Sequence, residues 1–359
     1  MTGVRITEDV FGTLPDGRAV DRVTLRGAQG FEARIITYGA ALQALVVPDA
    51  NGVCDDVLLG HDDIQGYLAH RQFFGATVGR YANRIANARF VLDGQTVRLN
   101  PNDGPHALHG GPDGFDRRLW QITKVEEGAQ PAVTLLYVSA DGEENYPGRL
   151  DIRVTYRLTG PTELSVEFVA RTSRPTIVNL TNHSFFNLDG VSAQTDILGH
   201  RLSVAADHFL AIDESAIPLP GPPRPVAGTP FDFREATAIG ARIRAADLQL
   251  RSGRGYDHNY CLRDAGGLRL AARLEAPRCG RVMELLTNQP GLQVYSGNYL
   301  DGTKGGKGRL HRQSDAICLE PQNWPDAPNR ADFPSPRLSP DQTYKHTIVY
   351  RFSTTGVRA

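Results

Sequence analysis

The chain has 359 residues, of which 40% are hydrophobic and 22% charged, a balance typical of a globular protein with a large core. Its formal net charge is −1, with Lys and Arg scattered among Asp and Glu, so no basic surface for a nucleic-acid backbone is expected. The longest apolar run, from Ala40 to Val47, is interrupted by Gln43 and ends at Pro48, which is too short to cross a bilayer. We therefore expect neither a nucleic-acid nor a membrane partner.

The amino-terminal sequence and the cysteines indicate the compartment. The segment MTGVRITEDVFGTLPDG carries charges from its first residues and has no apolar core of a signal peptide. The four cysteines, Cys54, Cys261, Cys279 and Cys318, are far apart and form no C-x-x-C pair, whereas a secreted disulfide scaffold is smaller and denser in cysteine. We expect buried or idle thiols in a cytoplasmic protein.

Alternating apolar and polar residues predict strands along the whole chain. Phe90 and Leu92 lead into Asp93-Gly94, a tight hairpin turn, and then into Val97 and Leu99. The segments 150–158 and 164–170 alternate in the same way around the turn TGPT and predict a second antiparallel hairpin. Close to the carboxyl end, the apolar residues of 344–352 share one face of a strand.

Helical periodicity is scarce. The best candidate for a helix lies between Arg234 and Leu250, after a Pro-rich loop from Pro218 to Pro230. With 37 Gly and 23 Pro to form turns, the chain is predicted to be mainly β, as a large antiparallel β-sandwich with few short helices. No fixed repeat or low-complexity linker divides the chain, so we expect residues 1–359 to form a single domain.

Dense polar residues interrupt the alternation in six segments, and β scaffolds usually carry function in such segments. The segments are GRYANRI from Gly79, GPHALHGG from Gly104, NLTNHSFFNL from Asn179, GYDHNY from Gly255, LQVYSGNYLDG from Leu292 and ICLEPQNWPD from Ile317. Their amides and charged groups suit a polyhydroxylated ligand, because each can exchange two hydrogen bonds with neighbouring hydroxyls. Their His, Asp and Glu side chains can also move protons.

Each polar residue also has a purely structural interpretation. His183 can be a hydrogen-bonded residue of a strand–loop junction, Asp257-His258 a turn cap, and Arg84 one half of a surface ion pair. Glu320 follows the apolar run ICL, where a carboxylate is costly to bury without a partner. This position favours a functional role for Glu320.

Two further motifs fit their apparent chemistry poorly. His106 and His109 are three residues apart, but Pro and Gly around them make a shared helical face for a metal improbable. The segment GTKGGKGR from Gly302 has three residues where a P-loop has four between its first Gly and the Gly-Lys pair, and it lacks the following Ser or Thr. We expect a solvated glycine loop there.

In this order, the polar segments resemble the aldose 1-epimerase (galactose mutarotase) family over nearly the whole chain. The most specific pieces are GRYANRIANARF, ALHGG with GFDRRLW, LTNHSFFNL, YDHNYCL, YSGNYLDGT and CLEPQNWPDAPN. The resemblance implies an isomerase, a large antiparallel sandwich with the sugar in an open cleft, no cofactor and no metal. A small-molecule sugar is then the partner, for a monomer or a homodimer.

The resemblance also assigns roles by matching positions. Glu320 of CLEPQ resembles the general base and His183 of TNHSFFNL the general acid. The residues that resemble sugar ligands are Asn83, Arg84, His109, Asp257 and Gln293, while His106 lies outside the family pattern. The chemistry agrees, since exchange of anomers needs one base for the C1 hydroxyl, one acid for the ring oxygen, and groups that hold the sugar.

Three alternatives stay open at this stage. A metal-dependent isomerase would use His106, His109, His183 and a carboxylate as ligands. A non-catalytic protein on the same sandwich would bind sugar without changing the rate of anomer exchange. A hexose-phosphate epimerase would need basic side chains that converge at one end of the cleft, with candidates Arg80, Arg84, Lys304 and Lys307. The preferred aldose is not written in the sequence.

Overall fold

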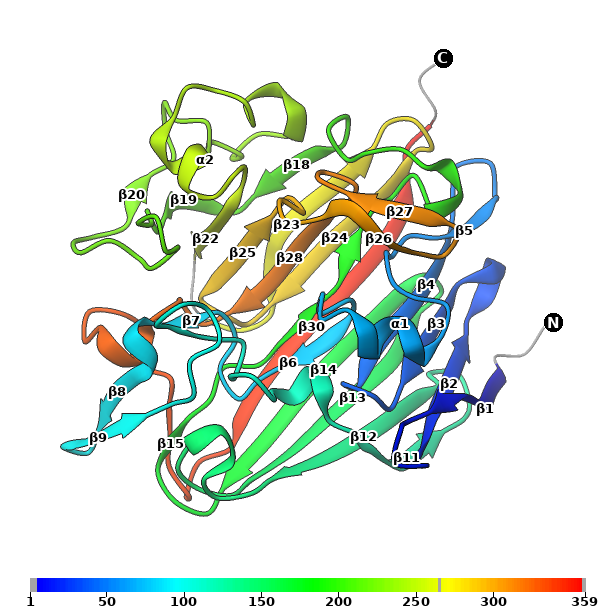
Figure 1. The fold of residues 1–359 in the computed structure, drawn as a ribbon. Coiled ribbons are helices and arrows are strands. Elements are labelled where there is room, and N and C mark those ends of the chain that lie inside the picture. The colour runs from blue at the N-terminus through cyan, green and yellow to red at the C-terminus, as the bar shows by residue number, and fades with distance from the viewer. Residues whose placement is uncertain (1–4, 264–265, 357–359) are drawn as a thin grey trace.

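The computed structural model describes residues 5–263 and 266–356. The first four residues of the amino-terminal segment discussed above therefore lie outside the described residues. Three antiparallel sheets make up most of the molecule, as the main-β prediction requires (Figure 1). No helix in the described part of the chain is long and apolar enough to span a membrane.

The largest sheet has nine strands in the order β11-β12-β13-β14-β30-β24-β23-β18-β21. Their bounds are Gln121–Glu126 (β11), Ala132–Ser139 (β12), Leu150–Gly160 (β13), Glu163–Thr172 (β14), Tyr344–Thr354 (β30), Arg281–Thr287 (β24), Arg269–Ala276 (β23), Arg201–Val204 (β18) and Thr237–Ala238 (β21). Both the predicted hairpin β13–β14 and the predicted carboxyl-terminal strand β30 are confirmed. Strand β30 joins the two halves of the sheet, because it pairs with β14 on one side and β24 on the other.

Two smaller sheets contribute to the same core. The five-stranded sheet consists of β1 (Arg5–Thr13), β2 (Ala19–Arg26), β3 (Glu32–Ile36), β4 (Ala41–Pro48) and β5 (Cys54–Asp56) in sequence order. The six-stranded sheet has the order β17 (Phe185–Phe186), β28 (Ile317–Gln322), β25 (Gly291–Tyr295), β22 (Asp257–Leu262), β19 (Ala206–Phe209) and β20 (Arg224–Pro225). One cluster of buried apolar side chains, from Val23 to Phe352, includes residues of all three sheets and is the core of the sandwich.

Short two-stranded ladders and turns connect the sheets. The ladders pair β6 (Ala76–Val78) with β16 (Thr181–His183), β7 (Arg84–Ile85) with β10 (Ala107–Leu108), β8 (Arg89–Leu92) with β9 (Gln95–Arg98), β15 (Thr176–Ile177) with β29 (Arg337–Leu338), and β26 (Asp301–Gly306) with β27 (Arg309–Arg312). The β8–β9 ladder is the predicted Asp93-Gly94 hairpin. Single 3-10 turns lie at Ala28–Gly30, Ala86–Ala88, Phe115–Arg117, Glu143–Asn145, Val191–Ala193, Ile239–Ala241 and Ala327–Asn329.

The predicted helix between Arg234 and Leu250 is wrong in most of its length. The α-helices of the described residues are α1 (Ile64–Ala69) and α2 (Leu248–Ser252). Residues 237–238 instead pair with β18 at the edge of the nine-stranded sheet, and Ile239 is buried in the core. The Asp247 carboxylate accepts from the backbone N–H groups at 249 and 250, so the helix begins only there.

The expected solvated glycine loop at 302–309 is also wrong. These residues form the β26–β27 hairpin, and the turn residue Lys307 points inward with its side chain only 8% exposed. Its Nζ binds the Asp56 carboxylate and the carbonyls of Gln43 and Leu58. Glycine spacing predicted a turn correctly, but it could not show that three acceptors lie close enough to bury the ammonium.

The four cysteines are free, as expected, with Cys318 buried and Cys54 exposed.

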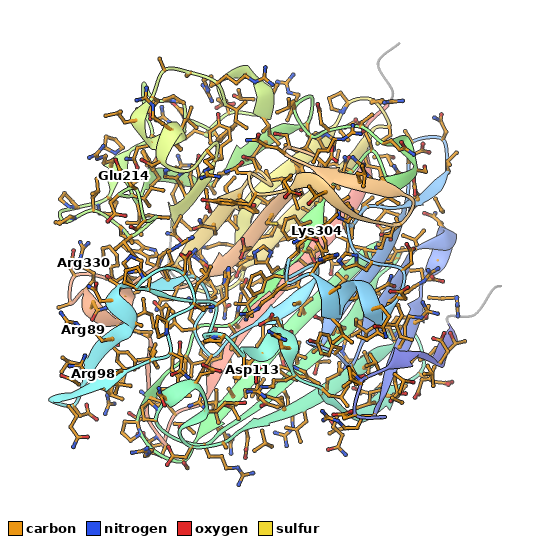
Figure 2. All side chains as sticks on the ribbon, in the orientation of Figure 1. Arg89, Arg98, Asp113, Glu214, Lys304 and Arg330 are labelled. Carbon is orange, nitrogen blue, oxygen red and sulfur yellow. The ribbon has the colours of Figure 1, made fainter. Side chains whose placement is uncertain are left out.

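Most charged side chains lie at the periphery, where positive and negative groups are mixed. Figure 2 shows Arg89, Arg98 and Arg330 projecting outward on one side, with Glu214 above them and Asp113 below the centre of the view.

Arg281 is an exception, because it is 2% exposed and binds carbonyl groups of other elements. Its guanidinium donates to the carbonyls of Val47, Val53, Leu188 and Asp189. This side chain therefore ties β24 of the nine-stranded sheet to the end of β4.

We predict that Arg281→Met lowers the free energy of unfolding by about 3 kcal/mol, because the buried carbonyls of Val47 and Leu188 and the partly buried carbonyls of Val53 and Asp189 each lose a donor worth about 1 kcal/mol. Urea denaturation measures the change. Arg278→Met is the matched control, since Arg278 is exposed three residues away and should shift stability by less than about 0.5 kcal/mol. Equal stabilities of the two variants would show that the buried guanidinium does not join the sheets.

Candidate functional site

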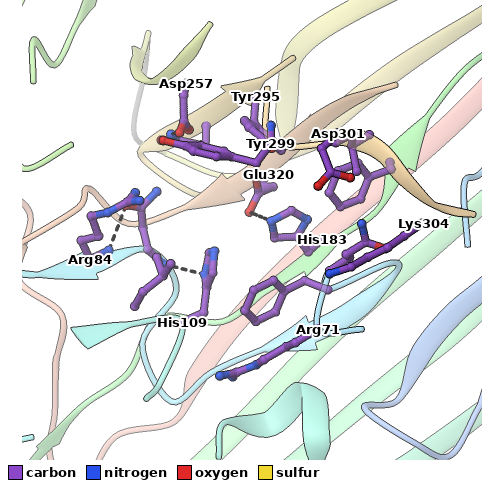
Figure 3. A pocket seen from close by; sticks show the side chains of 17 residues that line it. Arg71, Arg84, His109, His183, Asp257, Tyr295, Tyr299, Asp301, Lys304 and Glu320 are labelled. Atoms are coloured by element: carbon purple, nitrogen blue, oxygen red, sulfur yellow. Dashed lines mark hydrogen bonds and ion pairs between the residues drawn. The ribbon is translucent and has the colours of Figure 1, made fainter. Parts of the chain in front are cut away.

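All seven predicted site residues line a single cleft with a volume of about 270 Å³ (Figure 3). They are Asn83, Arg84, His109, His183, Asp257, Gln293 and Glu320. They come from β7, β16, β22, β25 and β28 and from the loops beside β7 and β10. A cleft of this size suits one small ligand.

Strand pairing explains why one wall of the cleft is polar. Glu320 on β28 lies opposite Gln293 on β25, which lies opposite Asn259 on β22. Because side chains alternate between the two faces, Asp257 shares this polar face, two residues from Asn259. The other face of the same strands carries Ile317, Leu319, Leu292, Val294 and Tyr260, which belong to the core cluster. Packing of the apolar face thus turns Glu320 toward the cleft.

Glu320 is 2% exposed, and its Oε2 lies 3.6 Å from Nε2 of His183 (Figure 3). Burial raises the pKa of the Glu320 carboxyl well above its usual range, the charge of Asp257 adds to this effect, and that of Arg84 opposes it. Burial lowers the pKa of His183 to about 4. Both shifts have the same cause, since a site closed to water disfavours charged groups. The two groups therefore resist becoming an ion pair while the cleft is empty.

His109 has a different role because its tautomer is fixed. The backbone N–H of Asn83 donates to Nδ1 of His109 at 3.1 Å, and this bond assigns the ring proton to Nε2. Burial, with the nearby His183, Arg84 and Arg71, lowers the pKa of His109 well below its usual value. His109 is therefore a neutral hydrogen-bond donor, whereas His183 is the imidazole that faces a carboxylate.

Arg84 binds one carboxylate and acts on the charge of a second. Its Nε donates to Asp103, which does not line the cleft, at 2.7 Å. Arg84 therefore forms the ion pair considered from the sequence and also lines the cleft. Within the cleft, its charge lowers the pKa of Asp257 against the larger, raising effect of burial. Nε2 of Gln293 donates to Oδ1 of Asp257 at 2.7 Å, which orients that carboxylate. The arrangement presents charge and amide groups for neighbouring hydroxyls.

The histidines outside the cleft are structural. His106 accepts from the backbone N–H of Asn87 through Nδ1 at 3.0 Å, and it does not line the cleft. His258 points to the opposite side of β22 and packs against Phe209 and Phe231. The predicted site includes neither His106 nor His258, and neither residue lines the cleft.

A metal-capable triad does exist, although it differs from the one considered from the sequence. One ligand atom each of His109, His183 and Glu320 lies within 4.8 Å of the others, and all three residues are buried. However, the Asn83 N–H already occupies Nδ1 of His109, so Nε2 keeps its proton and has no lone pair for a metal. The residues fit a hydrogen-bonding site better than a metal centre.

Sequence reasoning missed several residues of the cleft. They are Arg71, Gln72, Phe73, Leu108, Phe185, Tyr295, Tyr299, Leu300 and Asp301, whereas Lys304 was considered only as a ligand for a sugar phosphate. Most lie inside motifs already recognised, such as SFF and VYSGNYLDG, so proximity to His183 or Gln293 was an available signal. Arg71 and Phe73 lie in HRQFFG, a segment without any such signal.

Comparisons with known proteins identify the family of the chain. A family model described as aldose 1-epimerase matches residues 21–351. The galactose mutarotase of Rattus norvegicus is 44% identical over 98% of this chain and 99% of its own length. The aldose 1-epimerase of Escherichia coli K12 is 39% identical over 94% and 96%. A solved GalM/aldose epimerase homologue from C. elegans superimposes with a TM-score of 0.85 at 31% identity, over 94% of this chain and 100% of that one.

These matches confirm the resemblance inferred from the six motifs, and the solved structure confirms the predicted antiparallel sandwich. Family membership rests on the length of the match, since both relatives and the family model extend over nearly the whole chain. The chain belongs to the aldose 1-epimerase family of sugar isomerases.

Proposed function

We propose that this protein interconverts the α and β anomers of free aldohexoses such as galactose and glucose, with Glu320 as general base and His183 as general acid. The observation that carries the proposal is a buried carboxylate and imidazole, 3.6 Å apart, at the wall of a polar cleft. The names of the relatives from rat and E. coli support the substrate class.

The reaction needs only two proton transfers in each direction. Glu320 removes the proton of the C1 hydroxyl while His183 protonates the ring oxygen, which breaks the bond between C1 and that oxygen and opens the hemiacetal. Rotation about C1–C2 exposes the other face of the aldehyde. The ring oxygen then attacks C1 and returns its proton to His183, and the new C1 oxygen takes the proton from Glu320. Both groups end in their starting forms.

The environment strengthens both partners. A raised pKa makes the Glu320 carboxylate a stronger base, and a lowered pKa makes the His183 imidazolium a stronger acid. The pair holds one proton, which lies on Glu320 when both residues are neutral and on His183 when they form an ion pair. Conversion of one form into the other only moves this proton between the two residues. Arg84 favours the carboxylate form of Glu320, because its charge lowers that pKa.

Asn83, Arg84, His109, Asp257 and Gln293 are proposed to bind the hydroxyls. His109 supplies a fixed N–H donor, and Gln293 with Asp257 supplies a linked pair of polar groups. Such positioning is worth several orders of magnitude in rate when the reacting atoms are held in near-attack geometry.

A hexose phosphate is the weaker candidate, since the cations considered for it do not converge. Arg80 is 1% exposed, donates to the carbonyls of Pro147 and Gly148, and does not line the cleft. Lys307 binds Asp56, and Arg84 already binds Asp103. Of the four, Arg84 and Lys304 line the cleft.

We further infer a single domain over 1–359, because one apolar cluster joins β2 to β30. A cytoplasmic location is proposed from the four free thiols. The oligomeric state is proposed to be a monomer or homodimer, since the cleft is lined by one chain.

Purified protein should accelerate the decay of optical rotation of freshly dissolved α-galactose and α-glucose, because the pair catalyses ring opening without a cofactor. Polarimetry measures this rate before and after exhaustive dialysis against EDTA, which should leave it unchanged. Decay at the spontaneous rate for both sugars would indicate a binding protein instead. Loss on chelation that one divalent metal restores would favour the metal-dependent isomerase.

Glu320→Gln and His183→Gln should each lower kcat by about 10² or more, since each removes one proton-transfer group. The double variant should lose less than the product of the two factors, because both groups serve one event. Glu167→Gln, at an exposed position of β14, is the matched control and should behave as wild type. A folded Glu320→Gln protein with most of its kcat would place the base elsewhere, with Asp257 the next residue to test.

The pH profile of kcat/KM should stay flat well below the range of an ordinary histidine. The working pair holds one proton, and a second is gained only as His183 titrates at a pKa of about 4. Activity should therefore fall on the acid side near pH 4, and on the alkaline side as pH passes the raised pKa of Glu320. Polarimetry across this range, corrected for the spontaneous rate, checks it. An acid limb near pH 6.5 would mean that His183 is not desolvated.

A further inference from the structure

Two phenyl rings stack on the His183 ring. Phe73 stacks on it with ring centroids 5.6 Å apart and an interplanar angle of 21°. Phe185 stacks on it at 5.0 Å and 24°. Two nearly parallel rings therefore limit how far the imidazole can tilt.

No hydrogen bond from another residue performs this task. Nδ1 of His183 is buried and has no such partner among residues 5–263 and 266–356. A working histidine is usually oriented by a bond from its second nitrogen to a carboxylate or a carbonyl. His109 is oriented by a bond of the opposite direction, in which the backbone N–H of Asn83 donates to Nδ1, whereas Nδ1 of His183 has no partner in the described part of the chain.

Each phenyl ring is held by its own part of the fold. Phe73 has a positive φ of 59°, an unusual conformation for a bulky residue, and the Arg71 guanidinium carbon lies 4.8 Å from its ring centroid. Arg71 in turn makes a two-bonded pair with Asp116, at 2.8 Å for both bonds. Strain of this kind persists only where the surroundings enforce it, so the Phe73 ring is fixed rather than free.

Phe185 is fixed from the sheet side. It lies on β17, where it pairs with Cys318 of β28, the strand that carries Glu320. Tyr295, which also lines the cleft, packs edge-on against it at 5.9 Å. The position of Phe185 and the position of Glu320 therefore both depend on the pairing of β17 with β28.

We propose that Phe73 and Phe185 are positioning residues that orient the His183 ring toward the reacting sugar and stabilise its protonated form by stacking. The proposal rests on His183 being the general acid. A phenyl face is electron-rich and attracts a cation, and the attraction is larger in a desolvated site. Two such faces compensate in part for the burial that disfavours the imidazolium.

Other groups that face the His183 ring must be accounted for in any pH measurement. Glu320 of β28 lies 3.6 Å away, and the His109 ring is 5.3 Å away in an edge-on contact. Tyr295 of β25 is 6.4 Å away, and the Arg71 charge lies beyond Phe73. None of these groups is altered by substitution of a phenylalanine.

The test compares Phe73→Leu, Phe73→Tyr and Phe185→Leu with Phe74→Leu. Leucine keeps apolar bulk and bears the same positive-φ strain at position 73, so the comparison isolates the flat aromatic face. Phe74 packs on Phe185 but makes no ring contact with His183, which makes it the matched control. Thermal unfolding confirms that each variant is folded, and Phe73→Leu alone suffices if Phe185→Leu does not fold.

Phe73→Leu and Phe185→Leu should each lower kcat about three- to tenfold, the size of one cation–π contact, with KM changed less than about twofold. Phe73→Tyr should recover most of kcat, and Phe74→Leu should keep it. The acid limb of kcat/KM should move to lower pH, since the imidazolium loses a favourable contact. If the two phenylalanines served only to exclude water, water would reach His183 in the leucine variants, the pKa of His183 would rise, and the acid limb would move to higher pH.

An unchanged kcat in both leucine variants, or an acid limb that moves upward, would overturn this inference. The proposed function is tested separately by His183→Gln. Should that variant stay fully active, the assignment of the acid is wrong whatever the phenylalanine variants do. Should it be inactive while Phe73→Leu and Phe185→Leu resemble wild type, only the positioning role is wrong.

Discussion

A carboxylate removed from water imposes the main constraint on this structure. Glu320 occupies a central strand of the six-stranded sheet and is 2% exposed, in a setting where an unpaired charge is costly. The strand is fixed because its other face, with Ile317 and Leu319, belongs to the core. The same period-two alternation that builds the sandwich therefore delivers a reactive side chain to the cleft.

The surroundings of Glu320 follow from this constraint. His183 lies 3.6 Å away as a neutral partner, and Arg84 provides a positive charge that Asp103 partly balances from outside. His109 is prevented from competing for the proton, since a backbone N–H holds its tautomer. Two histidines of similar burial are thus given different chemistry by one hydrogen bond.

Aromatic residues replace water around the pair. Phe73 and Phe185 stack on the His183 ring, and Tyr295 meets it edge-on. Burial of the pair raises the pKa of Glu320 and lowers that of His183, which makes the carboxylate a strong base and the imidazolium a strong acid, while the phenyl rings offset part of the cost of the buried imidazolium. The reactivity of the pair and the stability of its walls therefore depend on the same packing.

Local patterns were sufficient for much of the fold and for the members of the site. The alternation at 150–170 and 344–352 and the Asp93-Gly94 turn identified strands and hairpins, since they depend on neighbours in sequence. The helix at 234–250 and the loop at Lys307 were predicted wrongly, because a sheet edge and three distant acceptors decide their structure. Motifs named Glu320 and His183, but they carried no signal for Phe73, and they gave no physical reason why His183 and His109 differ. By itself the sequence determined the family, the sandwich and the chemical groups. Only the tertiary structure decided their protonation and orientation, because burial, tautomer and ring stacking arise from residues that are far apart in the chain.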